Sequence, residues 1–96
     1  AMSDVEIVRA DDRYEVHVDG ERAGFTEARE RDGVVVMPHT EIDDAYSGQG
    51  LAGRLVRFAL DDIRGRGLTV DPRCPYVKGW IDKHPDYQDL LAPHAD

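Results

Sequence analysis

One residue, Cys74, has a type and position that suit acyl or proton transfer. It is the only cysteine in the chain, and it directly precedes Pro75, a residue type favoured in the first turn of a helix. The dipole of a helix favours the ionised form of a thiol at its N-cap. Such a thiol can donate a proton, act as a base or attack a carbonyl carbon. The alternative is a buried cysteine that packs as a small apolar side chain.

His39 is the second candidate, because a neutral imidazole can accept a proton from an attacking amine near neutral pH. Side chains alternate along a strand, so His39 and Glu41 would share one face if this segment is extended. Glu41 would then be able to orient the imidazole. The alternative is a solvent-facing pair at the end of a strand. Both interpretations stay open from the sequence alone.

A glycine-rich stretch, "SGQGLAG" from Ser47 to Gly53, contains the pattern G-x-G-x-x-G. Glycines let backbone N–H groups approach an anion, and a following helix carries about +0.5 charge at its N-terminus. NAD is one possible ligand, with Asp71 as the ribose-binding acid. The order of elements argues against NAD, because the dinucleotide fold begins with this unit and needs several parallel strands after it. A turn that only caps a helix is the remaining alternative.

The elements that must position these residues follow from hydrophobic periodicity. Four strands are predicted in the first half: Val5–Ala10, Arg13–Val18, Glu21–Arg29 and Val34–Met37. Asp19-Gly20 and Arg31-Asp32-Gly33 are typical of hairpin turns, so we expect an antiparallel meander. The last apolar run fits a central strand that is covered on both faces. Gly24 is a possible bulge, and Pro38, which cannot donate to a ladder, predicts a bulge or one-sided pairing.

The period changes in the second half of the chain. Apolar residues at three- and four-residue steps predict a helix over Gln49–Arg64, which the glycines of Gly65–Leu68 end. We expect a strand at Leu68–Val70, a helix from Pro75 with Trp80 in its apolar stripe, and a last apolar turn with Tyr87. The order β-β-β-β-α-β-α predicts one α+β domain over residues 2–92. The fourth and fifth strands should be parallel, joined by a right-handed crossover. Ala1 is set aside as a cloning remnant and residues 93–96 as a short tail.

Composition excludes several classes of function. The net charge is −8, from 20 acidic and 12 basic residues, which argues against a nucleic-acid partner. A single cysteine excludes an internal disulfide framework, and the four histidines lack metal-ligand spacing, so we expect no metal. We find no apolar run of membrane-spanning length and no signal peptide, so no membrane partner is expected and the cytoplasm is the expected location.

The order of elements and the glycine-rich turn resemble the GNAT superfamily of acetyl-CoA-dependent N-acetyltransferases. The cofactor motif of that superfamily, [R/Q]-x-x-G-x-[G/A], aligns with Ser47 to Ala52. Gly50 and Ala52 match the motif, whereas Ser47 departs from it and removes one side-chain contact. The segments "HTEI" and "CPYVKGWIDKHPDYQDLL" resemble more specifically the very small, single-domain members with a C-P-[YF] element and a His-Pro-[ED]-Tyr ending.

This resemblance implies the acyl-CoA N-acyltransferase fold, with acetyl-CoA as co-substrate and an amine as acceptor. It implies a pyrophosphate on the backbone of Ser47, Gly48, Gln49, Gly50, Leu51, Ala52 and Gly53. It also implies a pantetheine arm between the splayed fourth and fifth strands, paired with the backbone near Thr40, Glu41 and Ile42. The thioester would lie near Pro38 to Thr40 and Cys74. Tyr76 is either a hydrogen-bonding residue near the thioester or a core aromatic.

The chain departs from larger superfamily members, which usually carry one or two helices between the first strands. Here the segment from Val5 to Ile42 has room only for strands and turns, so the acceptor side should be open. An open side suits a protein or peptide amine, or a second subunit in a homodimer. It equally suits a non-catalytic acyl-CoA-binding module, or an interaction protein with a vestigial cleft.

Overall fold

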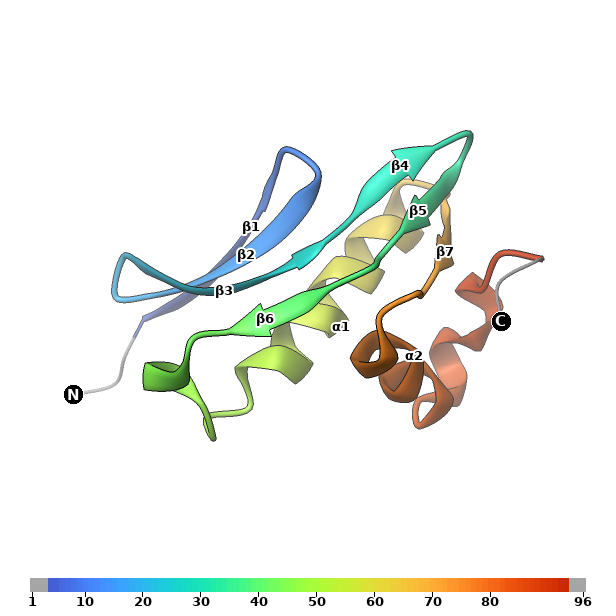
Figure 1. Cartoon of the computed structure of the whole chain (residues 1–96). Helices are drawn as coiled ribbons and strands as arrows, with labels where there is room; N and C mark the ends of the chain where they lie inside the picture. The colour runs from blue at the N-terminus through green and yellow to red at the C-terminus, as the bar shows by residue number, and fades with distance from the viewer. Residues whose placement is uncertain (1–3, 94–96) are drawn as a thin grey trace.

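The computed structural model describes residues 4–93, so Ala1 and most of the predicted tail lie outside the described residues. Two layers make up the molecule, with strands in one and helices in the other (Figure 1). In chain order the elements are β1 (Val5–Ala10), β2 (Arg13–Val18), β3 (Glu21–Glu27), β4 (Arg29–Arg31), β5 (Val34–Val36), β6 (Thr40–Ile42), η1 (Asp44–Tyr46), α1 (Leu51–Gly65), β7 (Thr69–Asp71), α2 (Pro75–Asp82) and η2 (Pro85–Leu90).

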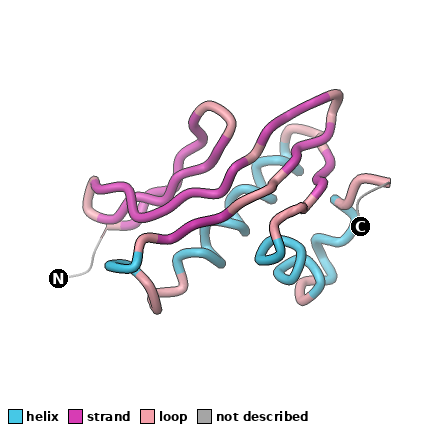
Figure 2. The backbone as a smooth tube through the Cα atoms, in the orientation of Figure 1, coloured by secondary structure: helices cyan, strands magenta, loops and turns pink. Residues whose placement is uncertain are grey.

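The antiparallel meander that the sequence predicts is present, but two of its strands are interrupted. β1, β2, β3 and β6 pair in that order, and β4, β5 and β7 form a second set. The predicted strand Glu21–Arg29 is wrong as one element, because it breaks at Ala28 into β3 and β4. The tube view follows both long hairpin arms past these breaks (Figure 2). The prediction that the fourth and fifth strands are parallel is confirmed by β5 and β7, in which Val35 lies opposite Val70.

The two predicted bulges fall close to where the sequence indicates them. Val16 faces Gly24 and His17 faces Arg22, so Ala23 is the extra residue in β3. A Cβ atom on Gly24 would collide with the backbone of β6, which explains why only glycine fits there. The irregularity around Pro38 separates β5 from β6 and changes the register against the neighbouring arm.

The helices begin and end close to their predicted positions. α1 starts at Leu51 rather than Gln49, because Gly50 is the N-cap and has the left-handed φ of 72°. It ends at Gly65, one residue beyond the predicted end. α2 begins at Pro75 with Cys74 as its N-cap, as the sequence predicts. These limits leave Ser47 to Gly50 of the glycine-rich stretch outside the helix and place Leu51 to Gly53 in its first turn.

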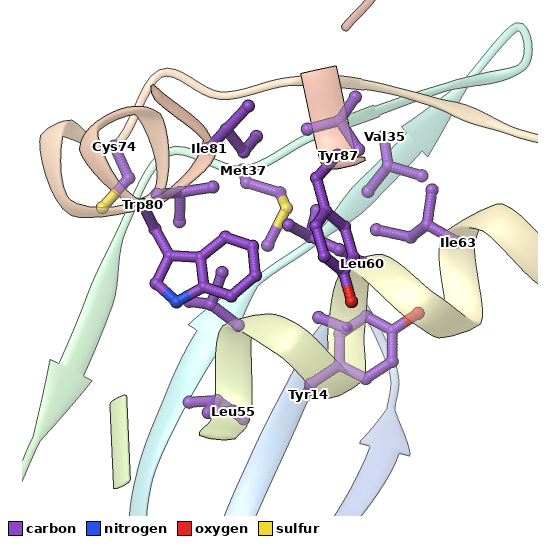
Figure 3. Close-up of a cluster of buried hydrophobic side chains, with 14 of the residues drawn as sticks. Tyr14, Val35, Met37, Leu55, Leu60, Ile63, Cys74, Trp80, Ile81 and Tyr87 are labelled. Carbon is purple, nitrogen blue, oxygen red and sulfur yellow. The ribbon is translucent and has the colours of Figure 1, made fainter. Parts of the chain in front are cut away.

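A single core joins the two layers. Tyr14, Leu60, Met37, Trp80 and Tyr87 come from five different segments and converge in it (Figure 3). Trp80 and Tyr87 are therefore core residues, as predicted. The expectation that Val34–Met37 is covered on both faces is wrong, because Val34 and Val36 are only half-buried. Since α1 and α2 pack on the same face, the opposite face of the strands carries no helix in residues 4–93 (Figure 1).

Candidate active site

The sheet opens where β5 gives way to β6. β5 pairs with β7 as far as Met37, whose N–H donates to the Asp71 carbonyl at 3.0 Å. The last backbone hydrogen bond between these two segments is donated by the Cys74 N–H to the Met37 carbonyl, at 2.8 Å. Beyond it the chain after β7 turns into α2, and β6 continues beside β3 alone. β6 and the start of α2 therefore diverge without a backbone hydrogen bond between them, and the opening between these two backbones is termed the gap (Figure 1).

One edge of β6 faces this gap with free backbone groups. The His39 carbonyl accepts from Glu27 and the Asp43 N–H donates to Ala23, both at 2.8 Å. In an antiparallel pair, residues that bond to the neighbouring strand alternate with residues whose N–H and C=O point away from it. Thr40 and Ile42 are the residues of β6 that point away from β3. Their backbone groups can pair with an extended amide-bearing chain laid in the gap.

Cys74 lies at the closed end of the gap. Its Sγ donates to Thr40 Oγ1 at 3.5 Å, and that oxygen is in turn 2.8 Å from Thr26 Oγ1. The thiol is almost fully buried, with 4% of the residue exposed. A thiol with so little exposed surface is largely screened from bulk solvent. Thr26 is the fully buried polar residue that sequence reasoning missed; a lone threonine at an inward position of β3 was its only signal.

His39 and Glu41 share one face of β6, as alternation predicts. Their side chains are 3.3 Å apart between Nε2 and Oε1, and both are more than half exposed, at 52% and 56%. The His39 ring also lies 5.9 Å from the ring of Phe25, centroid to centroid. Thr40, which Cys74 contacts, alternates with them and lies on the other face. The structure therefore places the side chains of His39 and Cys74 on opposite sides of β6.

The glycine-rich turn presents a row of free backbone donors. Gly48 and Gly50 have φ values of 78° and 72°, and a Cβ atom added at either position would meet nothing within 4 Å. Within residues 4–93, no backbone acceptor is found for the N–H groups from Gly48 to Gly53. The N-cap supplies no side-chain bond either. Donors at a helix start that no protein group satisfies form a suitable anion site.

Ser47 differs from the residues that follow it in the turn. Its N–H and its hydroxyl both donate to the Asp44 carbonyl, at 3.2 and 2.9 Å. These bonds fix the turn after η1 but use the donors of Ser47 internally. The free donors therefore begin at Gly48. Gln49 is exposed, while the Leu51 side chain enters the core and leaves only its backbone at the turn.

Tyr76 and Trp80 reach the first turn of α1 from α2. A Cβ atom on Gly53 would lie 3.7 Å from the Tyr76 hydroxyl and 3.8 Å from Trp80 Nε1. Tyr76 is 44% exposed, so its interpretation as a core aromatic is wrong. Partial burial raises the pKa of Tyr76, so its hydroxyl stays a hydrogen-bond donor at neutral pH. Hydrophobic periodicity places Trp80 in the core but does not indicate that its N–H lies beside the turn.

The described residues contain neither a side-chain cluster suited to a metal ion nor a helix suited to crossing a membrane. Among residues 4–93, no group of three or more His, Cys, Asp or Glu side chains is arranged to hold a metal ion. In the same part of the chain, no helix combines the length and the apolar character that crossing a membrane needs.

A sequence model of the GCN5-related N-acetyl-transferase family matches residues 13–90, which include the glycine-rich turn, β6 and Cys74. The chain belongs to this family. Protein NATD1 of Mus musculus is 34% identical over 62 residues, which cover 62% of this chain and 56% of NATD1. NATD1 of Homo sapiens is also 34% identical over 62 residues, 55% of its length. The chain thus spans little more than half the length of these curated relatives.

Solved structures share the GCN5-related fold. A GCN5-like protein from Staphylococcus aureus superposes with a TM-score of 0.72 at 23% identity, over 97% of this chain and 96% of that one. The ribosomal-protein-S18-alanine N-acetyltransferase of Escherichia coli has a TM-score of 0.64 at 15% identity, over 78% of this chain and 53% of that one. At these identities the likeness concerns the fold alone. It confirms the α+β, GNAT-like fold that the sequence predicts.

Proposed function

We propose that this chain binds acetyl-CoA and transfers the acetyl group to an amine. One observation carries the proposal: β6 begins at Thr40, which the Cys74 thiol contacts, and leads through η1 to the free backbone donors of the glycine-rich turn. Family membership supports acetyl transfer as the chemistry. The segments around His39 and Cys74 resemble those of the very small, single-domain members of the GNAT superfamily, and would place the chain in that subgroup.

The site residues fit the parts of acetyl-CoA in order. The amides of Gly48 to Gly53 would hold the pyrophosphate, with the partial positive charge of the α1 N-terminus behind them. The free edges of Thr40 and Ile42 would pair with the amides of the pantetheine arm. Glu41 contributes its extended backbone to the same strand, and Tyr76 would donate a hydrogen bond near Gly53. No atom lies within 4 Å of the positions that Cβ atoms would take at Gly48 and Gly50, so the pyrophosphate would have room to approach the backbone there.

Cys74 and His39 would have separate roles in acetyl transfer. When bound, acetyl-CoA supplies an activated thioester. Cys74 would donate a proton to the departing sulfur, since its Sγ–H already points to an oxygen at the edge of the gap. His39, held by Glu41 on the uncovered face, would accept the proton of the amine. A nucleophilic role for Cys74 is the alternative, in which its sulfur carries the acetyl group between donor and acceptor.

The acceptor would approach the uncovered face of the strands. No helix covers this face in the described residues, and a hollow of about 490 Å³ lies on it. Carboxylates outnumber guanidinium groups around the hollow, whose charged residues are Asp11, Asp12, Glu15, Glu27, Arg13 and Arg29. An open, mainly acidic face suits a protein or peptide amine with neighbouring positive charges. Closure by a second copy of the chain is the other arrangement that an open face allows.

Cys74→Ala tests the proposal and separates it from a non-catalytic acyl-CoA-binding role. The second candidate is favoured by the burial of Cys74 and by the placement of His39 on the opposite face. We expect the variant to bind acetyl-CoA with unchanged affinity in calorimetry. We also expect its transfer rate to an amine peptide to fall by about 10²–10⁴-fold.

Thr40→Val is the matched control, because it removes the hydroxyl that Cys74 contacts but keeps the thiol. A transfer rate for Cys74→Ala equal to that of the wild type would contradict the role of Cys74. Binding of acetyl-CoA without transfer to any amine by the wild type would support the second candidate instead.

A further inference from the structure

β1 is an edge strand of the sheet, with a neighbour on one side only. Within residues 4–93 it pairs with β2 alone. The Asp19 N–H donates to the Asp4 carbonyl at 2.8 Å, which fixes the alternation of backbone bonds along β1. Every second residue from Asp4 onwards bonds to β2, and the backbone groups of the alternate residues point away from the sheet. The residues that point away are Val5, Ile7 and Arg9.

The other outer strands are short, bridged or part of the candidate active site. β4 has only three residues, and β7 carries an isolated bridge to Leu91 besides its pairing with β5. The free side of β6 faces the gap. β1 has six residues, an unbroken register and neither proline nor lysine. Proteins usually protect a long edge strand with such features, because an unpaired edge can pair with another chain. Among the described strands, β1 is therefore the edge best suited to a further strand.

Apolar side chains line the helix-facing side of this edge. Val5 and Ile7 are half-buried and pack against the margin of the core. Phe58 of α1 is 42% exposed, although a large aromatic side chain normally gains stability by burial. A groove of about 450 Å³ runs along α1, and Ile7 and Phe58 both line it. A strand added beside β1 would therefore bury apolar side chains as well as satisfy backbone groups.

The sequence of β1 is complementary to itself when two copies run antiparallel. An axis at Ile7, perpendicular to the sheet, sets Ile7 opposite the partner's Ile7 and Val5 opposite the partner's Arg9. Every outward N–H and C=O group of the strand then has a partner. On the other face of the strand, each Glu6 lies opposite an apolar side chain, the partner's Val8. No two charges of like sign are opposed in this register.

Neighbouring registers oppose charges of like sign. An axis at Glu6 sets the two copies of that carboxylate opposite each other, and an axis at Arg9 does the same for two guanidinium groups. An axis at Val8 brings Asp4 towards the partner's Asp12. Like charges directly opposite each other on paired strands are unfavourable. Charge therefore selects the register that is centred on Ile7.

We infer that two copies of this chain pair through β1 and join their four-stranded sheets into one continuous sheet. Arg9 Nη1 lies 3.6 Å from Asp62 Oδ2 of α1, so the odd-numbered side chains of β1 face the helical layer. The axis then places both α1 helices on the same side of the joint sheet, with Phe58 beside the joint. β6 is at the opposite edge of each sheet, so both candidate active sites stay open. The inference is thus independent of the proposed function.

Sedimentation velocity over a range of protein concentrations tests the inference without any ligand. We expect the measured mass to rise with concentration towards that of two chains. Each copy carries a net charge of −8, so raising sodium chloride from about 0.05 to 0.5 M should screen the repulsion and tighten the dimer. The mass of one chain at every concentration and at both salt concentrations would overturn the inference.

Two substitutions at Val8 test the register. Val8→Lys places an ammonium opposite the partner's Glu6 and should lower the dissociation constant several-fold, whereas Val8→Glu should raise it several-fold. Within one chain Val8 also lies opposite Glu15, so the urea stability of each variant is measured at a concentration where it is monomeric. Equal dissociation constants for the two variants would contradict pairing through β1 in this register.

Cysteine cross-linking locates the axis independently, in a Cys74→Ala background that has no other thiol. Ile7→Cys places two thiols on the axis, where the Cα atoms of a hydrogen-bonded pair are about 5.5 Å apart and within reach of a disulfide. Glu6→Cys is the matched control, because its two copies are offset along the strands by two residues and lie about 8 Å apart. We expect mild oxidation to give a covalent dimer with Ile7→Cys and little with Glu6→Cys. Equal yields from the two variants would overturn the axis at Ile7.

Discussion

Cys74 shows how far single residues can be predicted. Its place at the start of a helix follows from Pro75 alone, and the structure confirms it. The contact of its Sγ with Thr40 could not be predicted, because it joins residues 34 apart that only the sheet register brings together. That His39 and Glu41 share a face could be predicted from strand alternation alone. That Cys74 lies on the other side of β6 could not, because it depends on the register of the whole sheet.

The glycine at position 50 of the turn can be tested by comparing its replacement with the same replacement at Gly67. Gly50→Val and Gly67→Val place a branched side chain at φ values of 72° and 73°, with no atom within 4 Å of the new Cβ in either case. Both variants should lose about 1–2 kcal/mol of unfolding free energy in urea titrations, because the left-handed conformation is strained. Only Gly50→Val should also lose coenzyme A affinity, by tenfold or more. Comparable affinity in the two variants would remove Gly50 from the anion site.

At the scale of elements, periodicity predicts where helices and strands form, and local packing decides where they break. The start of α1 moves from Gln49 to Leu51 because Gly50 adopts a left-handed conformation that the apolar pattern does not report. The break between β3 and β4 at Ala28 follows from the irregular arm opposite, around Pro38. The prediction that β5 is covered on both faces fails because a run of apolar residues does not show which face of the strand lacks a helix.

The packing of α1 on β2 predicts a change of stability at alkaline pH. Burial, with a hydrogen bond to the Asp62 carboxylate, raises the pKa of Tyr14 from 10.0 to about 12. The unfolded chain therefore loses this proton at a lower pH than the folded chain. The stabilisation is complete below pH 10 and is lost as the pH rises towards 12, by about 2–3 kcal/mol.

Urea titrations of wild type and Tyr14→Phe between pH 9 and 12 measure this effect. The phenylalanine variant should be less stable at pH 9, because it loses the bonds to Asp62 and Arg66. It should also lose less stability above pH 10. A smaller slope will remain, since the pKa values of Tyr46, Tyr76 and Tyr87 are raised as well. Parallel pH profiles for the two proteins would contradict the assignment to Tyr14.

At the scale of the whole molecule, the fold could be predicted because element order, turn signals and the glycine-rich motif all agree. The single helical layer and the uncovered strand face follow from the short connections before Ile42. The groove along α1 was not foreseen, because its residues come from β1, α1 and α2 and each looks ordinary within its own element.

Net charge leads to a prediction about the acceptor. At −8, the molecule should attract cationic peptides over distances that salt screens. Raising sodium chloride from about 0.05 to 0.5 M should increase the KM for a lysine peptide with basic neighbours several-fold, with a smaller change in kcat. A peptide of the same length with acidic neighbours serves as the control and should show the opposite trend or none. A KM for the basic peptide that is independent of salt would contradict electrostatic selection of the acceptor.

Coenzyme A binding at the glycine-rich turn and the free edge of β6 is central to the proposed function. Titration of ¹⁵N-labelled protein with coenzyme A, followed by amide NMR, tests it most directly, with NAD as the comparison. We expect saturable shifts concentrated at the amides of Gly48 to Gly53 and of Thr40 and Ile42, and none there with NAD. Shifts that are absent with coenzyme A, or confined to other parts of the chain, would contradict binding at this site.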